Sequence, residues 1–370
     1  MKKILFGITS LTLGGAERVL VDLANKLCEK YEITIFTIYA NGELEKQLSK
    51  NVNLKTLYKK QYLELSNWER KIVPIKVLLN KKKIYNNYIK ANYDVEISFL
   101  EGPITRLFGV RNNNTRKISW IHNDISLVFG NGLKAKIKRF IDKKVYSKYD
   151  TLVFVSKENL KNFNETYKML ADVKKEVICN YIDANRIIEK AEEKSEIEFS
   201  KNSTNLVTVA RLVPQKAIDR FIEVHSQLIN EGLNHEVYLI GDGPEKEKLE
   251  KSIKENKVEN SFHLLGKKEN PYPYIKNADY FCLLSNFEGY GMVLEEAKIF
   301  GKNIIITNTA AREAVENYKN SIILENSKEG IYNGLKEILK EKKQENIEKN
   351  RIKEYDNSKI IGQVVELLES

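Results

Sequence analysis

The chain has 370 residues, which is longer than a typical domain of roughly 100 to 200 residues and therefore predicts two domains. An apolar share of 42% and an aromatic share of 9% are enough for packed cores and exclude a disordered chain. The formal net charge of +10 implies an acidic partner, such as nucleic acid, an anionic membrane or a phosphorylated ligand.

Two further features of the sequence concern membranes and thiols. No stretch approaches the roughly 18 apolar residues that a membrane span needs. The N-terminus is typical of a first strand rather than a secretory signal, because its short apolar run meets residues 11–20 without a small-residue cleavage site. Cys28, Cys179 and Cys282 lie far apart without CxxC spacing, which predicts buried thiols in a reducing compartment. We therefore expect a cytoplasmic protein.

Short apolar runs rich in β-branched residues alternate with amphipathic helical patterns along the whole chain. The predicted strands lie at 3–10, 32–39, 94–100, 117–123 and 151–156 in the first half, and at 205–211, 236–243, 261–266, 279–285, 303–308 and 321–325 in the second. This alternation predicts parallel sheets with helices on both faces, the doubly wound α/β class.

The grouping of the strands predicts two Rossmann-like domains that face each other across a cleft. We expect the first over 1–183 and the second over 204–354, with a charged, Ser- and Asn-rich linker at 184–205 between the two sets of strands. The amphipathic helix expected over about 355–370 is a candidate to pack back on the first domain. In open α/β sheets ligands bind beyond the carboxyl ends of the strands, so the loops after the strands are where chemistry is expected.

The loop after the first strand contains a glycine pair. Gly14 and Gly15 allow a tight turn and leave backbone amides at the start of a helix, where a phosphate or a sugar hydroxyl is favoured. Turn geometry alone explains such a pair equally well, and Glu17 is explained by the helix dipole as well as by ligand contact.

His122 ends the predicted strand at 117–123, with Asn123 and Asp124 beside it. This position at a carboxyl strand end indicates a site residue, although a hydrogen-bonded structural histidine is the alternative. His225, on a helix, and His235, on a loop, are predicted to be structural, and so is the strand residue His263.

Two cations follow the first strand of the second set. Arg211 and Lys216 lie in a strand-to-helix loop, where a planar guanidinium and a mobile ammonium suit a diphosphate. The alternative is ordinary surface charge, because Lys and Arg are abundant throughout the chain.

Three glutamates flank the Gly-Tyr-Gly turn near residue 290. Glu288 precedes the next helix, Gly289 and Gly291 free the backbone, and the helix carries Glu295 and Glu296. A carboxylate accepts two hydrogen bonds side by side, which suits a vicinal diol of a ribose or a hexose. Helix-dipole complementarity is the alternative, above all for Glu295.

Together these motifs resemble the retaining glycosyltransferases of the family 4 type, which have the GT-B fold of two Rossmann-like domains. The Glu-x7-Glu spacing is met by Glu288 and Glu296. ARLVPQK is similar to the family's Arg-x4-Lys loop, LIGDGP to its Gly-Asp-Gly-Pro turn, GGAE to its N-terminal glycine loop and SWIHND to its active-site histidine segment. The resemblance covers nearly the whole chain.

The resemblance implies a role for each motif. Arg211 and Lys216 would hold the nucleotide diphosphate, Glu296 the ribose, and Glu288 with the amides of Gly289 and Gly291 the donor sugar. His122 would lie near the reacting carbon, Gly14 and Gly15 under the diphosphate, and the Gly241 and Gly266 turns beside the base. The implied catalytic set is His122, Glu288, Arg211 and Lys216.

The implied reaction transfers a hexose or N-acetylhexosamine from a nucleotide sugar, with UDP the preferred carrier, and retains the anomeric configuration. Fixed cations and a helix dipole would stabilise the charge that develops on the leaving diphosphate. We expect no cofactor beyond the nucleotide-sugar co-substrate. No Asp-x-Asp occurs in the chain, so we also expect no metal.

Two departures from the family pattern affect the donor side. Ala217 follows Lys216 where glycine is common, and Ala311 and Arg312 precede Glu313 where glycines are common. They put the approach of the helix to the phosphates and the recognition of the donor sugar in question.

Basic tracts are concentrated in the first half. Residues 59–90 contain nine Lys or Arg against two Glu, and residues 134–148 contain seven against one Asp. In the second tract Ile137, Phe140, Ile141 and Val145 have helical spacing, which fits an amphipathic helix on an anionic membrane. A helix that packs this stripe on the sheet is the alternative.

The membrane interpretation implies a peripheral protein on the inner face of the cell membrane and a polyprenyl-diphosphate-linked glycan acceptor in surface polysaccharide synthesis. A soluble glycan acceptor is the other possibility. A basic nucleic-acid-binding protein would explain the charge but neither the glutamate pair nor the cation loop, and no such motif is visible, so no nucleic acid is expected. Nucleotide-sugar epimerases and sugar phosphorylases share the fold and stay open as alternatives.

Overall fold

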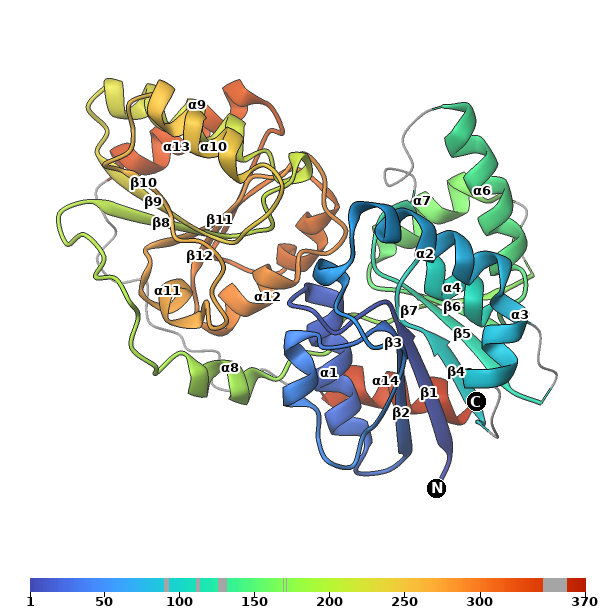
Figure 1. Ribbon diagram of the computed structural model, residues 1–370. Coiled ribbons are helices and arrows are strands. Elements are labelled where there is room, and N and C mark those ends of the chain that lie inside the picture. The colour runs from blue at the N-terminus through green and yellow to red at the C-terminus, as the bar shows by residue number, and fades with distance from the viewer. Residues whose placement is uncertain (90–92, 111–113, 126–131, 169, 171, 342–357) are drawn as a thin grey trace. The chain divides into compact units, whose positions relative to one another are not determined.

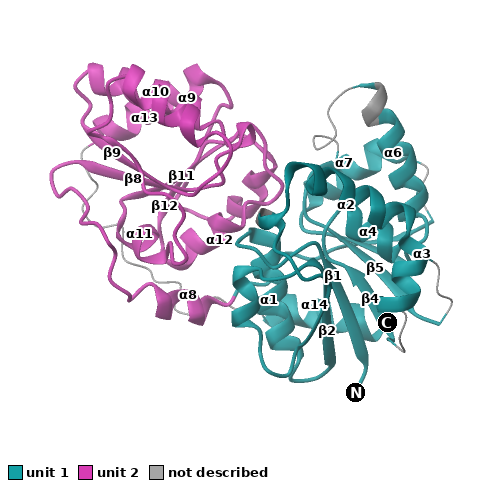
Figure 2. Cartoon of the chain, in the orientation of Figure 1, with its two compact units in different colours: residues 1–182, 357–370 teal, residues 183–356 magenta. Residues whose placement is uncertain are grey.

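The structure is a computed structural model that describes residues 1–89, 93–110, 114–125, 132–168, 170, 172–341 and 358–370 (Figure 1). The chain forms two compact units: unit 1 is residues 1–182 with 357–370, and unit 2 is residues 183–356 (Figure 2). Within the described ranges, no helix is both long and apolar enough to cross a membrane.

Unit 1 is built on a parallel sheet of seven strands in the order β3-β2-β1-β4-β5-β6-β7. The strands are β1 Lys3–Ile8, β2 Glu32–Tyr39, β3 Asn53–Tyr58, β4 Val95–Ser98, β5 Arg116–Ile121, β6 Thr151–Phe154 and β7 Lys174–Val177. From β1 the chain adds strands outward on one side and then, starting with β4, on the other. The carboxyl ends of β1 and β4 therefore flank the switch point at which an open α/β sheet binds its ligand.

Helices cover both faces of this sheet, as Figure 1 shows. They are α1 Gly15–Leu27, α2 Asn67–Leu79, α3 Lys81–Ile84, α4 Pro103–Phe108, α6 Leu133–Tyr146, α7 Lys157–Thr166 and α14 Ser358–Glu369. The C-terminal helix α14 belongs to this unit, because Lys2 Nζ donates to the Leu368 carbonyl at 2.9 Å and Tyr31 Oη to Glu369 Oε1 at 2.7 Å. Leu367 and Leu368 are buried.

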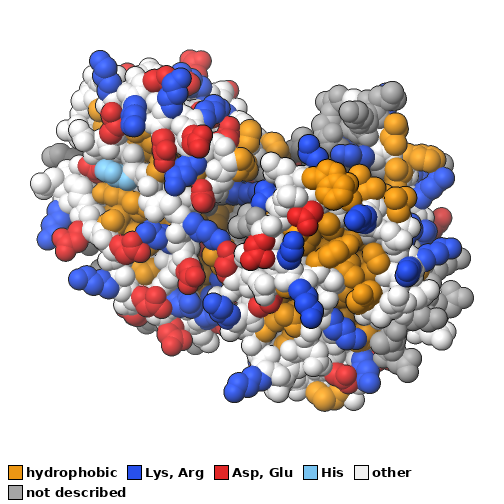
Figure 3. Space-filling view, in the orientation of Figure 1, with side chains coloured by type: hydrophobic (Ala, Val, Ile, Leu, Met, Phe, Trp, Pro, Cys, Tyr) orange, Lys and Arg blue, Asp and Glu red, His pale blue; other side chains and the backbone are white. Residues whose placement is uncertain are grey.

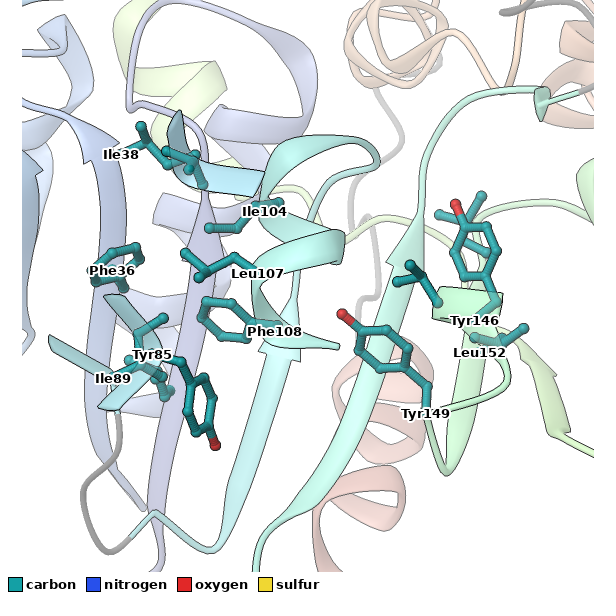
Figure 4. Close-up of a cluster of buried hydrophobic side chains, with 14 of the residues drawn as sticks. Phe36, Ile38, Tyr85, Ile89, Ile104, Leu107, Phe108, Tyr146, Tyr149 and Leu152 are labelled. Atoms are coloured by element: carbon teal, nitrogen blue, oxygen red, sulfur yellow. The ribbon is translucent and has the colours of Figure 1, made fainter. Parts of the chain in front are cut away.

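The core of unit 1 combines a large aromatic cluster with one buried ion pair. Phe36, Phe108 and their neighbours fill the space between the sheet and its helices (Figure 4). Lys117 Nζ lies 2.6 Å from Glu96 Oε2, and Tyr85 Oη donates to the other carboxylate oxygen at 2.6 Å. The three polar groups satisfy one another, which is the condition under which charges are tolerated in a core.

Unit 2 has a parallel sheet of six strands in the order β10-β9-β8-β11-β12-β13. The strands are β8 Thr204–Val209, β9 His235–Ile240, β10 Phe262–Leu264, β11 Tyr280–Leu283, β12 Asn303–Thr307 and β13 Ser321–Leu324. The helices are α8 Ala184–Lys190, α9 Ile218–Asn230, α10 Lys246–Glu255, α11 Tyr272–Asn277, α12 Met292–Ile299 and α13 Lys328–Lys340. Here the switch point lies between β8 and β11.

The predicted class of two doubly wound α/β domains is confirmed, and so are the eleven predicted strands. The sequence interpretation missed β3 and β7, which are the two edge strands of unit 1. Both are Lys-containing and carry no fully buried residue, so they lack the apolar pattern by which a central strand is recognised.

Two smaller predictions need correction. The segment predicted as a linker begins with α8, a regular helix that Asp183 caps by accepting from the Arg186 amide at 3.1 Å. The sequence of α8 is polar over much of the helix and contains no apolar run, so it has the composition of a loop. Of the cysteines only Cys282 is buried, whereas Cys28 and Cys179 are partly exposed.

Candidate functional site

The two loops at the switch point of unit 2 are joined directly to each other. The Asn286 amide donates to the Gln215 carbonyl at 2.9 Å, and Gln215 Nε2 donates to the Phe287 carbonyl at 3.0 Å. Asn286 Nδ2 donates to the Pro214 carbonyl at 3.0 Å. The cation loop after β8 and the glutamate loop after β11 therefore form one body at the carboxyl edge of the sheet.

This junction places Lys216 on Glu288. Lys216 Nζ pairs with Glu288 Oε1, which also accepts from Ser285 Oγ at 2.5 Å. The Glu288 side chain is buried and that of Lys216 nearly so. In this arrangement the ammonium can bind a phosphate, and the carboxylate can accept hydrogen bonds from sugar hydroxyls. The sequence predicted both residues but not their contact.

A second set of contacts supports the junction from behind. Arg220, in the first turn of α9, donates through Nη2 to the Leu284 carbonyl at 2.8 Å and to Asn326 Oδ1 at 2.9 Å. Arg211 is exposed just beyond β8, where its guanidinium is accessible to a ligand. The sequence analysis identified Arg211 and Lys216 but not Gln215, Ser285 or Arg220. The only signal that could have found these three is that each is a polar residue in or next to a predicted site loop.

Ala217 has the left-handed backbone conformation, with φ 50° and ψ 40°, at the turn that starts α9. Glycine adopts this conformation without strain, whereas a Cβ makes it costly. The geometry explains why glycine suits this position, and it shows that the turn is formed even with alanine.

The two predicted glycine turns lie beside the cation loop. The Gly241 amide donates to the Gly266 carbonyl at 2.9 Å, and a Cβ on Gly241 would lie 1.8 Å from the Ala210 carbonyl oxygen. Gly243 is equally close-packed, with a Cβ position 2.4 Å from the Leu212 carbonyl oxygen. The backbones after β8 and β9 thus approach one another more closely than any side chain would permit.

The two adjacent glutamates of α12 have different environments. Glu295 is buried and accepts from Tyr290 Oη at 2.8 Å and from Lys298 Nζ at 2.8 Å, so it is a structural carboxylate. Glu296 is partly exposed. Gly291, the N-cap, has φ 74°, a conformation that requires glycine and sets the direction in which the helix begins.

At the switch point of unit 1, α1 begins at Gly15 with Gly14 as an extended N-cap that has no side-chain hydrogen bond. The Arg18 amide donates to the Gly14 carbonyl at 3.0 Å. The Glu17 carboxylate lies over Gly14, with Oε2 2.3 Å from the position that a Cβ would take. A side chain at Gly14 would therefore displace Glu17 from the helix N-terminus.

The loop that carries His122 is held by a residue that the sequence analysis did not identify. Glu101, beyond the end of β4, accepts from the His122 amide at 2.5 Å and from the Asn123 amide at 2.7 Å through Oε1, and from Asn123 Nδ2 at 3.0 Å through Oε2. Burial raises the pKa of Glu101. Its position directly after an apolar run was the signal that could have found it.

The His122 imidazole lies against the Phe99 ring, with 4.7 Å between the ring centroids. Its Nε2 is buried and has no hydrogen-bond partner in the structure, although the residue as a whole is partly exposed. Burial lowers the pKa of His122 to about 3, so the imidazole is neutral at physiological pH. A neutral ring with an unused nitrogen is able to hydrogen-bond a ligand hydroxyl.

The remaining histidines lie away from both switch points. His225 Nδ1 and His235 Nε2 are 2.8 Å apart, and His225 Nε2 lies 2.8 Å from Ser261 Oγ. This buried chain fits the structural role predicted for both residues. His235 is the first residue of β9 rather than part of a loop, and His263 in β10 lies 2.6 Å from Glu236.

Unit 1 also has a cavity of about 240 Å³ at the carboxyl ends of β1 and β2. It is lined by Thr9, Ile38, Tyr39, Tyr62, Arg70, Val73, Pro74, Val77 and Pro103. The Arg70 guanidinium stacks over the Tyr62 ring at 5.3 Å. Aromatic walls with one cation suit a ligand that has both an apolar and an anionic part.

Comparison with known proteins identifies the class to which these features belong. Residues 189–355 match the family model described as Glycosyl transferases group 1. Unit 2 thus matches the glycosyltransferases of this group, and the chain has the GT-B fold. The matched residues lie within unit 2, which contains the joined cation and glutamate loops.

Curated relatives match over the length of the chain. The chain is 27% identical, over all of its length and all of the relative's, to an N-acetylgalactosamine-N,N'-diacetylbacillosaminyl-diphospho-undecaprenol 4-alpha-N-acetylgalactosaminyltransferase of Campylobacter jejuni. It is 23% identical to the O-antigen biosynthesis glycosyltransferase WclY of Escherichia coli, covering 83% of this chain and 80% of that one.

Solved structures support the fold. HepE of Anabaena, in complex with UDP and glucose, superposes over all of both chains with a TM-score of 0.75 and 17% identity. Sucrose-phosphate synthase of Thermosynechococcus elongatus superposes with a TM-score of 0.78 and 12% identity, covering all of this chain and 98% of that one. The predicted resemblance to GT-B glycosyltransferases is confirmed.

Among the side chains that the structure describes, no group of three His, Cys, Asp or Glu residues could hold a metal ion. Metal independence stays a prediction.

Proposed function

We propose that the enzyme transfers a hexose or N-acetylhexosamine from a nucleotide sugar, with UDP as the first expected carrier, to a polyprenyl-diphosphate-linked glycan. The anomeric configuration is retained and no metal takes part. The product belongs to surface polysaccharide synthesis. The observation that carries this proposal is the Lys216–Glu288 pair, set in two hydrogen-bonded loops at the switch point of unit 2.

The donor side follows from the chemistry of that pair. Lys216 and the exposed Arg211 supply the positive charge that a leaving diphosphate requires, and Glu288 holds Lys216 in place before the reaction begins. Glu288 and Glu296 are separated by the first turns of α12, so one can accept from the sugar and the other from the ribose. We assign the Gly241 and Gly266 turns to the base, because no side chain fits between Gly241 and the loop after β8, and no atom lies within 4 Å of the position that a Cβ on Gly266 would take.

The acceptor side follows from unit 1. His122 presents a neutral, buried nitrogen for a hydroxyl near the reacting carbon. Gly14 and Gly15 present the amides of α1 to the diphosphate of the nucleotide sugar. We assign the 240 Å³ cavity to the acceptor, with Arg70 addressing its diphosphate and Tyr62 its apolar part. The undecaprenol-linked substrate in the name of the Campylobacter relative supports an acceptor of this kind.

A transfer assay tests the proposal. UDP-linked hexoses and N-acetylhexosamines are incubated with undecaprenyl-diphosphate-linked saccharides in EDTA, and the product is identified by mass spectrometry and its anomeric configuration by NMR. We expect one sugar to be added in the configuration of the donor. An inverted product, or a strict requirement for a divalent cation, would contradict the corresponding part of the proposal.

The same assay separates the alternatives that share the fold. Turnover of the nucleotide sugar to its epimer without acceptor would identify an epimerase, and turnover that requires inorganic phosphate would identify a phosphorylase. Arg70→Ala is expected to raise the KM for the acceptor about tenfold while leaving the KM for the donor unchanged. Equal effects on both substrates would contradict the assignment of the cavity.

A further inference from the structure

Helix α2 exposes large apolar side chains on the face that points away from unit 1. Its inner residues Val73 and Val77 are buried, whereas Trp68, Ile75 and Leu79 are exposed, with 65% of Trp68 and 78% of Leu79 accessible. The helix is well formed, because Ser66 and Glu69 make a reciprocal capping box at its start. Its outer face is therefore a stable apolar ridge rather than a poorly folded segment.

Helix α6 exposes a second ridge of the same kind. Ile137, Phe140 and Ile141 follow one face of the helix, and 59% of Phe140 is accessible. Only the stripe's last member, Val145, is buried. The alternative that this stripe packs on the sheet is therefore wrong, since three of its four residues face outward and the helix is anchored instead through Val145, Tyr146 and Asp142.

Positive charge surrounds both ridges. Lys71 and Lys76 on α2 and Lys136, Lys138 and Lys144 on α6 are all exposed. Lys76 Nζ lies 5.9 Å from the centre of the Trp68 ring, and Lys144 Nζ lies 4.5 Å from that of Phe140. Both ammonium groups lie over the faces of these rings, so the long lysine side chains cover part of the apolar surface while their charged ends stay in water.

The acids on these helices do not offset this charge. Asp142 is buried and bound to Arg106 at 2.8 Å, and Glu69 caps its own helix and lies 3.6 Å from Lys60. The two ridges lie on the same side of the sheet, because α4 packs against both α2 and α6. Figure 3 shows hydrophobic side chains with Lys and Arg among them over the helices that Figure 1 labels α2 and α6.

We propose that the exposed faces of α2 and α6 form a docking surface that binds an anionic lipid bilayer, with Trp68, Ile75, Leu79, Ile137, Phe140 and Ile141 entering the interface and the surrounding lysines contacting lipid phosphates. Soluble proteins rarely expose several large apolar side chains together without a binding partner. A ring of mobile ammonium groups around such a surface matches a layer of anionic headgroups above acyl chains.

Other acidic partners fit this surface less well. Nucleic acid offers phosphates for the lysines but no apolar phase for Leu79 and Ile75, which would stay in contact with water. A protein partner would need a matching apolar face ringed by acids. The bilayer is the partner that satisfies the apolar and the charged groups together.

The docking surface is inferred from exposure and charge and does not depend on the proposed reaction. It nevertheless adds to that proposal, because helix α2 belongs to both the docking surface and the acceptor cavity. Val73, Pro74 and Val77 on its inner side line the cavity assigned to the acceptor. A helix that lies on the membrane with one face and on the cavity with the other would place the diphosphate of a lipid-linked acceptor next to Arg70.

Vesicle flotation of the full chain, without nucleotide sugar or acceptor, tests the proposal. We expect binding to vesicles of phosphatidylcholine mixed with phosphatidylglycerol and little binding to phosphatidylcholine alone. Leu79→Ser and Phe140→Ser should each lower the partition coefficient about tenfold, and Lys71→Gln about fivefold. Ile323→Ser, which removes an exposed apolar side chain from unit 2, is the matched control and should leave binding unchanged.

Tryptophan fluorescence gives an independent readout. Of the two tryptophans, Trp120 is buried and Trp68 exposed, so anionic vesicles should shift the emission of Trp68 to shorter wavelength and Trp68→Phe should abolish the shift. Absence of both flotation and shift would overturn the proposal. So would a change of oligomeric state by Leu79→Ser without any change in vesicle binding, which would make the surface a protein contact.

Vesicle binding and the reaction fail separately. Nucleotide binding measured by calorimetry should be the same for Leu79→Ser as for the native chain, because no residue of the docking surface belongs to unit 2. Loss of vesicle binding with intact nucleotide binding therefore concerns the docking surface alone.

Discussion

The switch points of the two units are organised in different ways. In unit 2 the two site loops bind each other, through Gln215 and Asn286 and through the Lys216–Glu288 pair, so the functional side chains are themselves part of the structure that positions them. In unit 1 the functional side chain His122 makes no hydrogen bond through Nε2, and its loop is held through backbone amides by Glu101.

This difference separates two ways of preparing a site for its ligand. In unit 2 binding and folding use the same contacts, so a change at the site affects both the ligand and the loops. In unit 1 the positioning carboxylate and the functional imidazole are different residues, so the position of the loop and its chemistry can be changed one at a time. The predictions below test that contrast.

Lys216→Met should have the largest effect, because it removes a cation from the diphosphate and leaves the buried Glu288 without its partner. We expect kcat/KM to fall about a thousandfold and the stability of unit 2 to fall by about 3 kcal/mol. Enzyme kinetics and chemical denaturation measure the two effects. The control is Lys248→Met, which breaks an exposed pair with Asp219 and should change neither. A loss of activity without a loss of stability would show that the pair is not structural.

Glu101→Gln should lower kcat about a hundredfold or less while leaving nucleotide affinity unchanged, because the substitution weakens the hold on the His122 loop, which belongs to unit 1. Kinetics and nucleotide titration of the same preparation separate the two. Glu32→Gln, at an exposed carboxylate paired with Lys3, serves as the control. If nucleotide affinity fell in parallel with kcat, Glu101 would be a general stability residue rather than a positioning residue.

Acid should destabilise both units through their buried histidines. Burial lowers the pKa of His122 to about 3 and that of His225 to about 2, and it also lowers the pKa of His235. These residues bind protons in the unfolded chain below about pH 6.5 but not in the folded one, so the stability they contribute is present above that pH and is lost as the pH falls toward the folded pKa.

At about pH 5 His122 and His225 should each cost about 2 kcal/mol, and His235 adds to the loss in unit 2, which makes that loss larger than in unit 1. Thermal unfolding followed by tryptophan fluorescence reports unit 1, where both tryptophans lie, and circular dichroism reports the whole chain. His122→Gln should flatten the pH dependence of the fluorescence transition only. If the fluorescence transition of that variant kept the same dependence on pH, the acid sensitivity of unit 1 could not be assigned to His122.

Ala217→Gly should have the smallest effect and the opposite sign. Relief of the left-handed strain is expected to stabilise unit 2 by up to about 1 kcal/mol. Ala278→Gly is a matched control, since both alanines are 2% exposed but Ala278 has φ −70°, and it should destabilise. Equal effects of the two substitutions would show that the turn at Ala217 is unstrained.

The sequence predicted the central strands and the residue types of the site because both are local. A β-branched run signals a buried strand by itself, and Glu288, Lys216 and His122 each follow such a run. The edge strands β3 and β7 were missed because exposure on an edge removes the apolar signal. The Glu-x7-Glu spacing of the resemblance selects Glu296 rather than Glu295, and in the structure Lys298 and Tyr290 engage Glu295.

What the sequence did not reveal depends on contacts between distant residues. Glu101 reaches the His122 amide from the end of the neighbouring strand, and Gln215 reaches Phe287 from the other side of the switch point. Neither residue type carries a signal of that partner. The outward direction of the α6 stripe is equally nonlocal, because helical spacing fixes which residues share a face but not what that face meets.

Calorimetric titration of the full chain with UDP, GDP and ADP in EDTA tests the central claim, that the joined loops of unit 2 bind a nucleotide diphosphate through Lys216. The account predicts that one nucleotide, expected to be UDP, binds without metal and that Lys216→Met weakens its affinity by about tenfold or more. Failure of all three to bind, or an affinity that Lys216→Met leaves unchanged, would contradict it.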